Sequence, residues 1–140
     1  MSLTFAIIKP DAVANGHTGK IIDRIIQEKF IIRGLKQVKM TQTVAEAFYE
    51  VHRERPFFSD LTRFMSSGKS IVLVLEKENA VNAWRELIGA TNPLQADANT
   101  IRKLFAENMS KNAVHGSDSA ENAQKEIAFF FTNQDIITNG

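Results

Sequence analysis

A chain of 140 residues with 44% hydrophobic residues is long enough to build one domain with a packed core, which we place over residues 1–140. The charges nearly balance, with 17 Lys and Arg and 16 Asp and Glu, which argues against a protein that holds long nucleic acids by phosphate neutralisation. Because the chain has no cysteine, disulfides and thiolate metal sites are excluded. Because its apolar runs are about five residues long, against the roughly 20 of a membrane span, and its start lacks a signal-peptide pattern, we expect a soluble, cytoplasmic protein.

The first elements are a strand, a helix and a weaker strand. Residues 3–9 form the apolar run of a buried strand, and Pro10 ends it because proline cannot donate to a β-ladder. Isoleucines at helical spacing predict a helix over about 18–29. A looser alternation between 35 and 40 suggests the second strand.

Two helices are expected next. Thr43 and Glu46 have the spacing of a capping box, so we expect a helix to begin there and to continue towards a break at Pro56. A second, shorter helix is expected over 59–65, closed by Gly68.

The second half of the chain predicts two further strands. Residues 70–76 are continuous and rich in β-branched side chains, which is typical of a central strand. Asn79 is a suitable cap for a helix that ends at Gly89. The remaining expected elements are a loop over 89–99, a helix over 100–108, a polar loop over 112–118, a helix over 119–126 and a last strand over 127–132.

This order predicts an α+β fold, namely a ferredoxin-like βαββαβ sandwich in which helices pack on a four-stranded antiparallel sheet. Such folds serve enzymes, metal carriers and RNA binders alike. The function must therefore be inferred from the residues of the site.

Several charged residues stand where they can meet an anion. Lys9 ends the first strand, where an ammonium can meet a phosphate as a point charge. Arg102 lies near a helix N-terminus, against the helix dipole, which hints at an anion-holding role, whereas the dipole alone explains Arg85 near the end of its helix. His115 precedes Gly116, which lets backbone or ligand approach closely, and histidine serves as nucleophile, base or metal ligand. Each of these residues also has an ordinary structural interpretation.

The aromatic residues and the other histidines are less informative. Phe57 is either core packing or a ring that stacks on a base, and Tyr49 is most simply a helix residue with its hydroxyl in water. His17 and His52 have ordinary turn and helix positions, and no second His or Cys stands at metal-ligand spacing from His115. Because the glycine-rich phosphate motifs G-x-x-x-x-G-K-[ST] and G-x-G-x-x-G are absent, side chains must hold any bound phosphate.

Five stretches together resemble the nucleoside diphosphate kinase family, in family order and spacing. They are IIKPDAV near the start, RPFF at 55–58, GATNP at 89–93, TIR at 100–102 and NAVHGSDS at 112–119. The similarity covers essentially the whole chain. It implies an enzyme that passes the terminal phosphate of a nucleoside triphosphate to a nucleoside diphosphate, by a ping-pong mechanism through a phosphohistidine on His115 and with broad base tolerance.

The resemblance also implies the roles of individual residues. The catalytic positions are His115 as the nucleophile, Ser117 and Glu126 as the residues that orient it, and Lys9 and Tyr49. The nucleotide-binding positions are Lys9, Phe57, Leu61, Arg85, Thr91, Arg102 and Asn112. Mg²⁺ is implied as a cofactor that arrives with the nucleotide, and the partners implied are nucleoside di- and triphosphates and further copies of the chain, in a tetramer or hexamer built from dimers.

Three residues depart from the family pattern. Lys29 stands where many members have the glycine of a K-G-F turn, Lys69 replaces a common proline, and Leu104 replaces a common aspartate. None of these is a catalytic position in the family.

Two other functions are considered beside this one. An RNA-binding protein would need an aromatic RNP-type signature, and the aromatic run at 127–132 lacks it, so nucleic acid is not expected as a main partner. A membrane is not expected either, because the apolar runs are short. A histidine phosphocarrier that serves other proteins would share the nucleophile but would not need residues arranged for a nucleotide.

Overall fold

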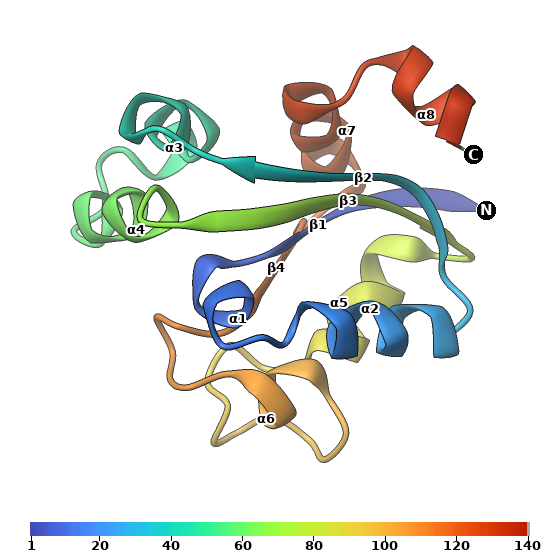
Figure 1. Cartoon of the computed structure of the whole chain (residues 1–140), viewed down its shortest axis with the longest axis horizontal. Coiled ribbons are helices and arrows are strands. Elements are labelled where there is room, and N and C mark those ends of the chain that lie inside the picture. Colours follow the sequence, from blue (N-terminus) through green and yellow to red (C-terminus); the bar gives the residue numbers. More distant parts are fainter. Residues whose placement is uncertain (140) are drawn as a thin grey trace.

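The computed structural model describes residues 1–139, with side chains through residue 137. Four strands form one antiparallel sheet in the order β2-β3-β1-β4 (Figure 1). The strands are β1 (Ser2–Ile8), β2 (Ile31–Lys39), β3 (Lys69–Lys77) and β4 (Val114–Gly116). The helices are α1 (Pro10–Ala14), α2 (Thr18–Gln27), α3 (Gln42–Phe48), α4 (Phe58–Met65), α5 (Ala80–Ile88), α6 (Ile101–Phe105), α7 (Ala120–Phe130) and α8 (Asn133–Asn139), with a 3-10 turn, η1, at Glu50–His52. This arrangement confirms the predicted ferredoxin-like α+β class.

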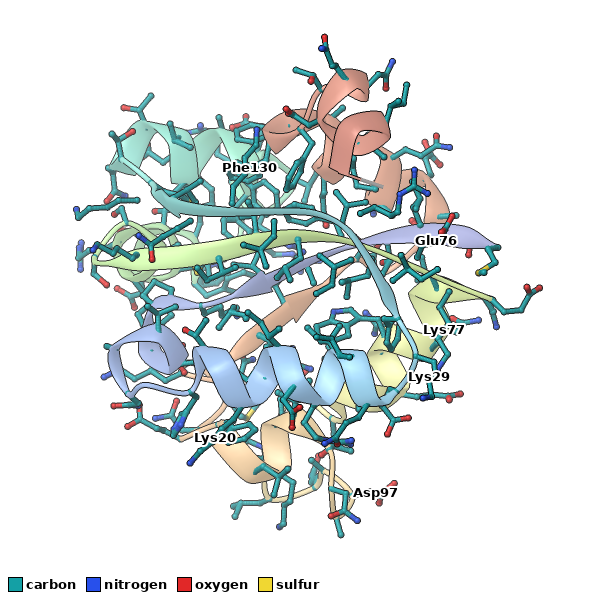
Figure 2. All side chains as sticks on the ribbon, turned by 45° about the vertical axis from the view of Figure 1, so that its right-hand side comes forward. Lys20, Lys29, Glu76, Lys77, Asp97 and Phe130 are labelled. Carbon is teal, nitrogen blue, oxygen red and sulfur yellow. The ribbon has the colours of Figure 1, made fainter. Side chains whose placement is uncertain are left out.

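Helices cover both faces of the sheet, which is why the middle of each central strand is buried and mostly apolar. Along β1, Ala6 and Ile8 point towards α2 and α5, whereas Phe5 and Ile7 point towards α3, α4 and α7. Figure 2 shows side chains filling both layers, with Phe130 on the α7 side. Because alternate residues of a strand face opposite sides, one short strand contributes to two separate cores.

The fourth strand lies elsewhere than the sequence pattern predicts. Residues 127–130 continue helix α7 instead of forming a strand, and β4 forms within the segment that we expected to be a loop. A short apolar run does not distinguish a strand from a buried helix by its periodicity. Here Ala123 and Ile127, four residues apart on α7, are both buried, which is the spacing of a helix face.

Several element ends also differ from expectation. Thr41, not Thr43, caps α3, and its hydroxyl accepts the Val44 amide at 3.1 Å. α4 ends at Met65 with Ser66 as its C-cap, before Gly68. Asn79 precedes α5 in a left-handed conformation without a capping hydrogen bond. α7 begins where the sequence predicts a helix, with Ser119 as its N-cap, whose hydroxyl accepts the Asn122 amide.

The backbone of the turn between α2 and β2 accounts for the glycine that the family pattern has at position 29. Lys29, which Figure 2 labels just beyond the end of α2, lies in this turn. Its φ is 67°, in the left-handed region that favours glycine. The family glycine therefore fits this backbone, and Lys29 adopts it under steric strain.

No helix within residues 1–139 is long and apolar enough to cross a membrane. The longest described helix, α7, has 11 residues.

Candidate active site

Pairing between β4 and β1 positions His115 at the sheet edge. His115 lies opposite Ile7, and its ring contacts three aromatic rings edge-on: Phe5, Phe48 and Tyr49 at centroid distances of 6.1, 5.7 and 6.2 Å. These rings limit the orientation of the imidazole, while its side chain keeps 18% exposure. The ring is thus fixed and still accessible.

One carboxylate joins the two residues that flank Gly116. Glu126 Oε1 lies 2.9 Å from His115 Nε2 and accepts the Ser117 hydroxyl at 2.7 Å. Glu126 reaches this point because Ser119 begins α7 about two turns earlier. We assign the imidazole proton to Nε2, since a carboxylate accepts from a ring N–H. Nδ1 then carries the lone pair, and no hydrogen bond among the described residues engages it.

Lys9 is buried beside Asn112. Its ammonium Nζ donates to Asn112 Oδ1 at 2.8 Å, and the Asn112 amide donates to the Met109 carbonyl at 3.0 Å. Burial, reinforced by the charge of Arg102, lowers the pKa of Lys9 to about 8, although Asp11 opposes the fall. An anion brought close to Lys9 would therefore stabilise its charged form.

Two arginines and a threonine line one cavity of about 610 Å³, which Glu86 and Asp97 also border. Arg102 donates to the carbonyls of Gly89 and Val114, both at 3.0 Å, so it sits next to β4. Burial and then the charge of Arg85 lower the pKa of Arg102 to about 10. The third predicted residue on this wall is Thr91.

The α3–α4 segment carries the remaining predicted residues. Phe57 is 48% exposed, and its ring lies 5.4 Å from His52, which stacks at 6.4 Å on Tyr49. A row of rings thus leads from Phe57 to His115. Leu61 is half-buried and packs against the core on this face.

Tyr49 differs from expectation because its hydroxyl is buried instead of lying in water. Within residues 1–139 the oxygen has no hydrogen-bond partner. Burial, with the charge of Glu126, raises the pKa of Tyr49 well above its ordinary range. The phenol is thus a neutral group beside the His115 ring.

The structure brings most predicted residues into two connected groups. His115, Ser117, Glu126 and Tyr49 form one group around the imidazole, and Lys9 with Asn112 is linked through charge to the wall formed by Arg102, Arg85 and Thr91. Phe57 reaches the first group through the His52 ring, whereas no described contact joins Phe57 or Leu61 to the arginines.

Sequence reasoning missed three residues of this region. His52, treated as ordinary, lines a cavity of about 340 Å³ together with His115. The carboxylate of Asp11 accepts the Ala113 amide at 3.0 Å. Trp84 approaches Gly116, so the glycine makes room for an indole instead of for a ligand. Only Asp11 had a signal, since it belongs to the KPD motif; the other two depend on tertiary contacts.

Comparison with known proteins decides the family. The sequence model of the family described as nucleoside diphosphate kinase matches residues 2–136. The chain belongs to this family. A nucleoside diphosphate kinase of Geotalea uraniireducens is 55% identical over 137 residues, which cover 98% of this chain and 100% of the relative. One of Nitratiruptor sp. is 56% identical over 137 residues, with the same coverage.

Solved structures of nucleoside diphosphate kinases share the fold. The Aquifex aeolicus enzyme superposes with a TM-score of 0.95 at 48% identity, covering 96% of this chain and 98% of that one. The apo enzyme of Encephalitozoon cuniculi superposes with a TM-score of 0.91 at 37% identity, covering 97% and 92%. The resemblance drawn from the sequence motifs is thus confirmed.

Proposed function

We propose that this chain is a nucleoside diphosphate kinase, which transfers the terminal phosphate of a nucleoside triphosphate to a nucleoside diphosphate. The observation that carries the proposal is the His115 imidazole, held at Nε2 by Glu126 at 2.9 Å. His115 follows directly on Val114, whose carbonyl accepts from Arg102 at 3.0 Å, and Val114 follows on Ala113, whose carbonyl accepts the Lys9 amide at 2.8 Å. The family match over residues 2–136 supports one kinase domain across the chain, and we propose that it works in the cytoplasm.

The first half-reaction uses the free nitrogen of His115. The Nδ1 lone pair forms a bond to the γ-phosphorus, the bond from that phosphorus to the β,γ-bridging oxygen breaks, and the diphosphate leaves with that electron pair. The imidazole becomes positively charged, and Glu126 stabilises it across the 2.9 Å contact at Nε2. A second diphosphate then attacks the phosphohistidine and reverses these steps.

The cationic side chains stabilise charge on the phosphates. We assign Arg85, Arg102 and Thr91 to the phosphate chain, because they line one cavity beside β4. Lys9 and Asn112 are assigned to the ribose and phosphate region. Preorganised charges of this kind supply most of the rate in phosphoryl transfer, where positioning and electrostatics dominate.

We propose that the base is recognised by stacking. Phe57 offers an exposed ring face, and Leu61 supplies an apolar wall on the same helical segment. A ring face binds any base, whereas discrimination among bases requires matched hydrogen-bonding groups. Purine and pyrimidine nucleotides are therefore both expected as substrates.

We propose that Mg²⁺ enters bound to the nucleotide. Among the described residues, no three His, Asp or Glu side chains gather as a metal cage. The charged side chains assigned to the phosphates, Lys9, Arg85 and Arg102, are all cations, and a cation does not bind a metal ion. A magnesium ion carried by substrate phosphates fits its usual preference, because Mg²⁺ is reluctant to lose its waters.

We propose that copies of the chain associate through β2. This strand lies at the sheet edge, so its outer backbone groups lack a neighbouring strand among the described residues. Ile31 and Leu35 on β2 and Ile26 on α2 are exposed apolar side chains. Light scattering tests the association: the proposal expects a dimer-based tetramer or hexamer, and a monomer at micromolar concentration contradicts it.

Initial-rate kinetics test the proposed reaction. Varying triphosphate and diphosphate together should give parallel double-reciprocal lines, the mark of a covalent intermediate formed before the second substrate binds. Intersecting lines contradict the two half-reactions. A chain that takes phosphate from proteins but exchanges none between nucleotides would instead be a histidine phosphocarrier.

A further inference from the structure

Trp84 contacts the backbone of the proposed nucleophile from the other side of the sheet. Its indole Nε1 donates to the His115 carbonyl at 3.1 Å. Trp84 is fully buried on α5, in the core that α2 and α5 form against the sheet. The His115 ring instead contacts Phe5 and Phe48 in the opposite core. The hydrogen bond therefore holds the main chain of His115 without touching its ring.

The indole fits closely against the residue that follows. A Cβ at Gly116 would lie 2.7 Å from Trp84 Cδ1 and 2.9 Å from Nε1, closer than real Cβ contacts allow. On its other side, Trp84 packs edge-on against Phe30 at a centroid distance of 5.9 Å. The glycine and the phenylalanine together keep the indole N–H aimed at the carbonyl.

β4 depends on such support because it is short and lies at the sheet edge. It has three residues and pairs only with β1 among the described strands. Ala113, just before it, has a φ of 73°, and its amide is held by the Asp11 carboxylate. The segment is thus anchored before β4 by Asp11 and within β4 by Trp84.

We propose that Trp84 is a positioning residue for phosphoryl transfer, which holds the His115 backbone where Nδ1 meets the γ-phosphorus. This inference rests on the proposed function. Small misplacements of a reacting group reduce rates by roughly 100-fold without removing binding. Loss of the indole N–H should therefore slow phosphorylation of His115 while nucleotide affinity stays unchanged, since Trp84 does not line the cavity that holds Arg85 and Arg102.

The chain offers a clean way to remove this one hydrogen bond. Trp84 is the sole tryptophan, so replacing tryptophan during expression by β-(3-benzothienyl)alanine exchanges its N–H for sulfur and keeps the bicyclic shape. Trp84→Phe removes the same donor by mutation. Ile25→Val is the matched control, because Ile25 is fully buried in the same core and makes no hydrogen bond to β4.

The experiment measures single-turnover phosphorylation of each protein by ATP without an acceptor, beside the dissociation constant of ADP. We expect both tryptophan replacements to phosphorylate roughly 10 to 100 times more slowly than the natural protein, with ADP affinity changed less than twofold and the Ile25→Val rate unchanged. In the ¹H–¹⁵N spectrum, the single indole signal should shift when His115 is phosphorylated.

Three results would overturn the inference. The first is a benzothienyl protein that is phosphorylated as fast as the natural protein. The second is an equal loss of phosphorylation rate in Ile25→Val. The third is a parallel loss of ADP affinity in the tryptophan replacements, which marks a general structural defect. If Trp84→Phe fails to fold, the benzothienyl protein alone decides. If the natural protein itself takes no label on His115, the proposed function fails; if it does and the variants match it, only the role of Trp84 fails.

Discussion

Lys9 carries a buried charge, so Lys9→Met should change how the stability of the fold depends on pH. Burial lowers its pKa from 10.5 to about 8 in the folded chain. At about 1.4 kcal/mol for each pH unit, this difference corresponds to about 3 kcal/mol. It is the free energy by which the fold disfavours the charged form of Lys9.

The sign follows from the protons bound. Between pH 8 and 10.5 the unfolded chain keeps a proton on Lys9 that the folded chain has released. The unfolded state binds more protons in this window, so the free energy of unfolding rises with pH. The stabilisation that comes from this proton release is complete above pH 10.5. It decreases as the pH falls and is absent below about pH 8.

Urea denaturation at fixed protein concentration measures this effect. The free energy of unfolding of the natural protein minus that of Lys9→Met should rise by about 3 kcal/mol between pH 8 and 10.5. Subtracting the free energy of unfolding of the variant removes the contribution of the other titrating groups. Lys20→Met, which removes an exposed ammonium on α2, controls for the loss of one positive charge. A difference that stays constant or falls with pH would refute the buried charge on Lys9.

Three further predictions concern other residues. Asp11→Asn removes the charge that opposes the fall in the Lys9 pKa, so this pKa should fall further and the alkaline limb of the kcat/KM profile should move to lower pH. An unchanged pH profile contradicts the coupling between Asp11 and Lys9. Lys29→Gly relieves a φ of 67° and should raise the free energy of unfolding by about 0.5 to 1 kcal/mol in urea, whereas a loss of stability argues against strain. Phe57→Ala should weaken all common nucleotides by similar factors in kcat/KM, and a natural preference among bases above roughly 10⁴ would require polar readout instead of stacking.

The fold class was predictable because its central strands are unambiguous. β1 and β3 are buried on both faces, so their residues form short apolar runs, and the enrichment of these runs in β-branched side chains favours a strand over a helix. The fourth strand was not predictable in this way. β4 has three residues and exists because it pairs with β1, while the apolar run at 127–132 suits both a strand and a helix face.

The site was predictable where residues form motifs and unpredictable where distant side chains meet. Position singled out Lys9, Arg102 and His115 as candidates, and the family resemblance supplied the other site residues. The burial of Tyr49, by contrast, depends on how α3 packs against α7 and β1. The contact between Trp84 and His115 joins residues 31 positions apart on opposite faces of the sheet. No local pattern in either segment encodes it.

Covalent labelling tests the central claim most directly. The protein is mixed with Mg²⁺ and ATP labelled on the γ-phosphate, without any acceptor. A phosphohistidine on His115 predicts one label per chain that resists alkali, is lost in acid, and transfers to added diphosphate. His115→Ala should take no label, whereas His17→Ala, whose ring packs against Phe105 away from this site, should label as the natural protein does. An unlabelled natural protein, or an acid-stable label that survives in His115→Ala, would contradict the account.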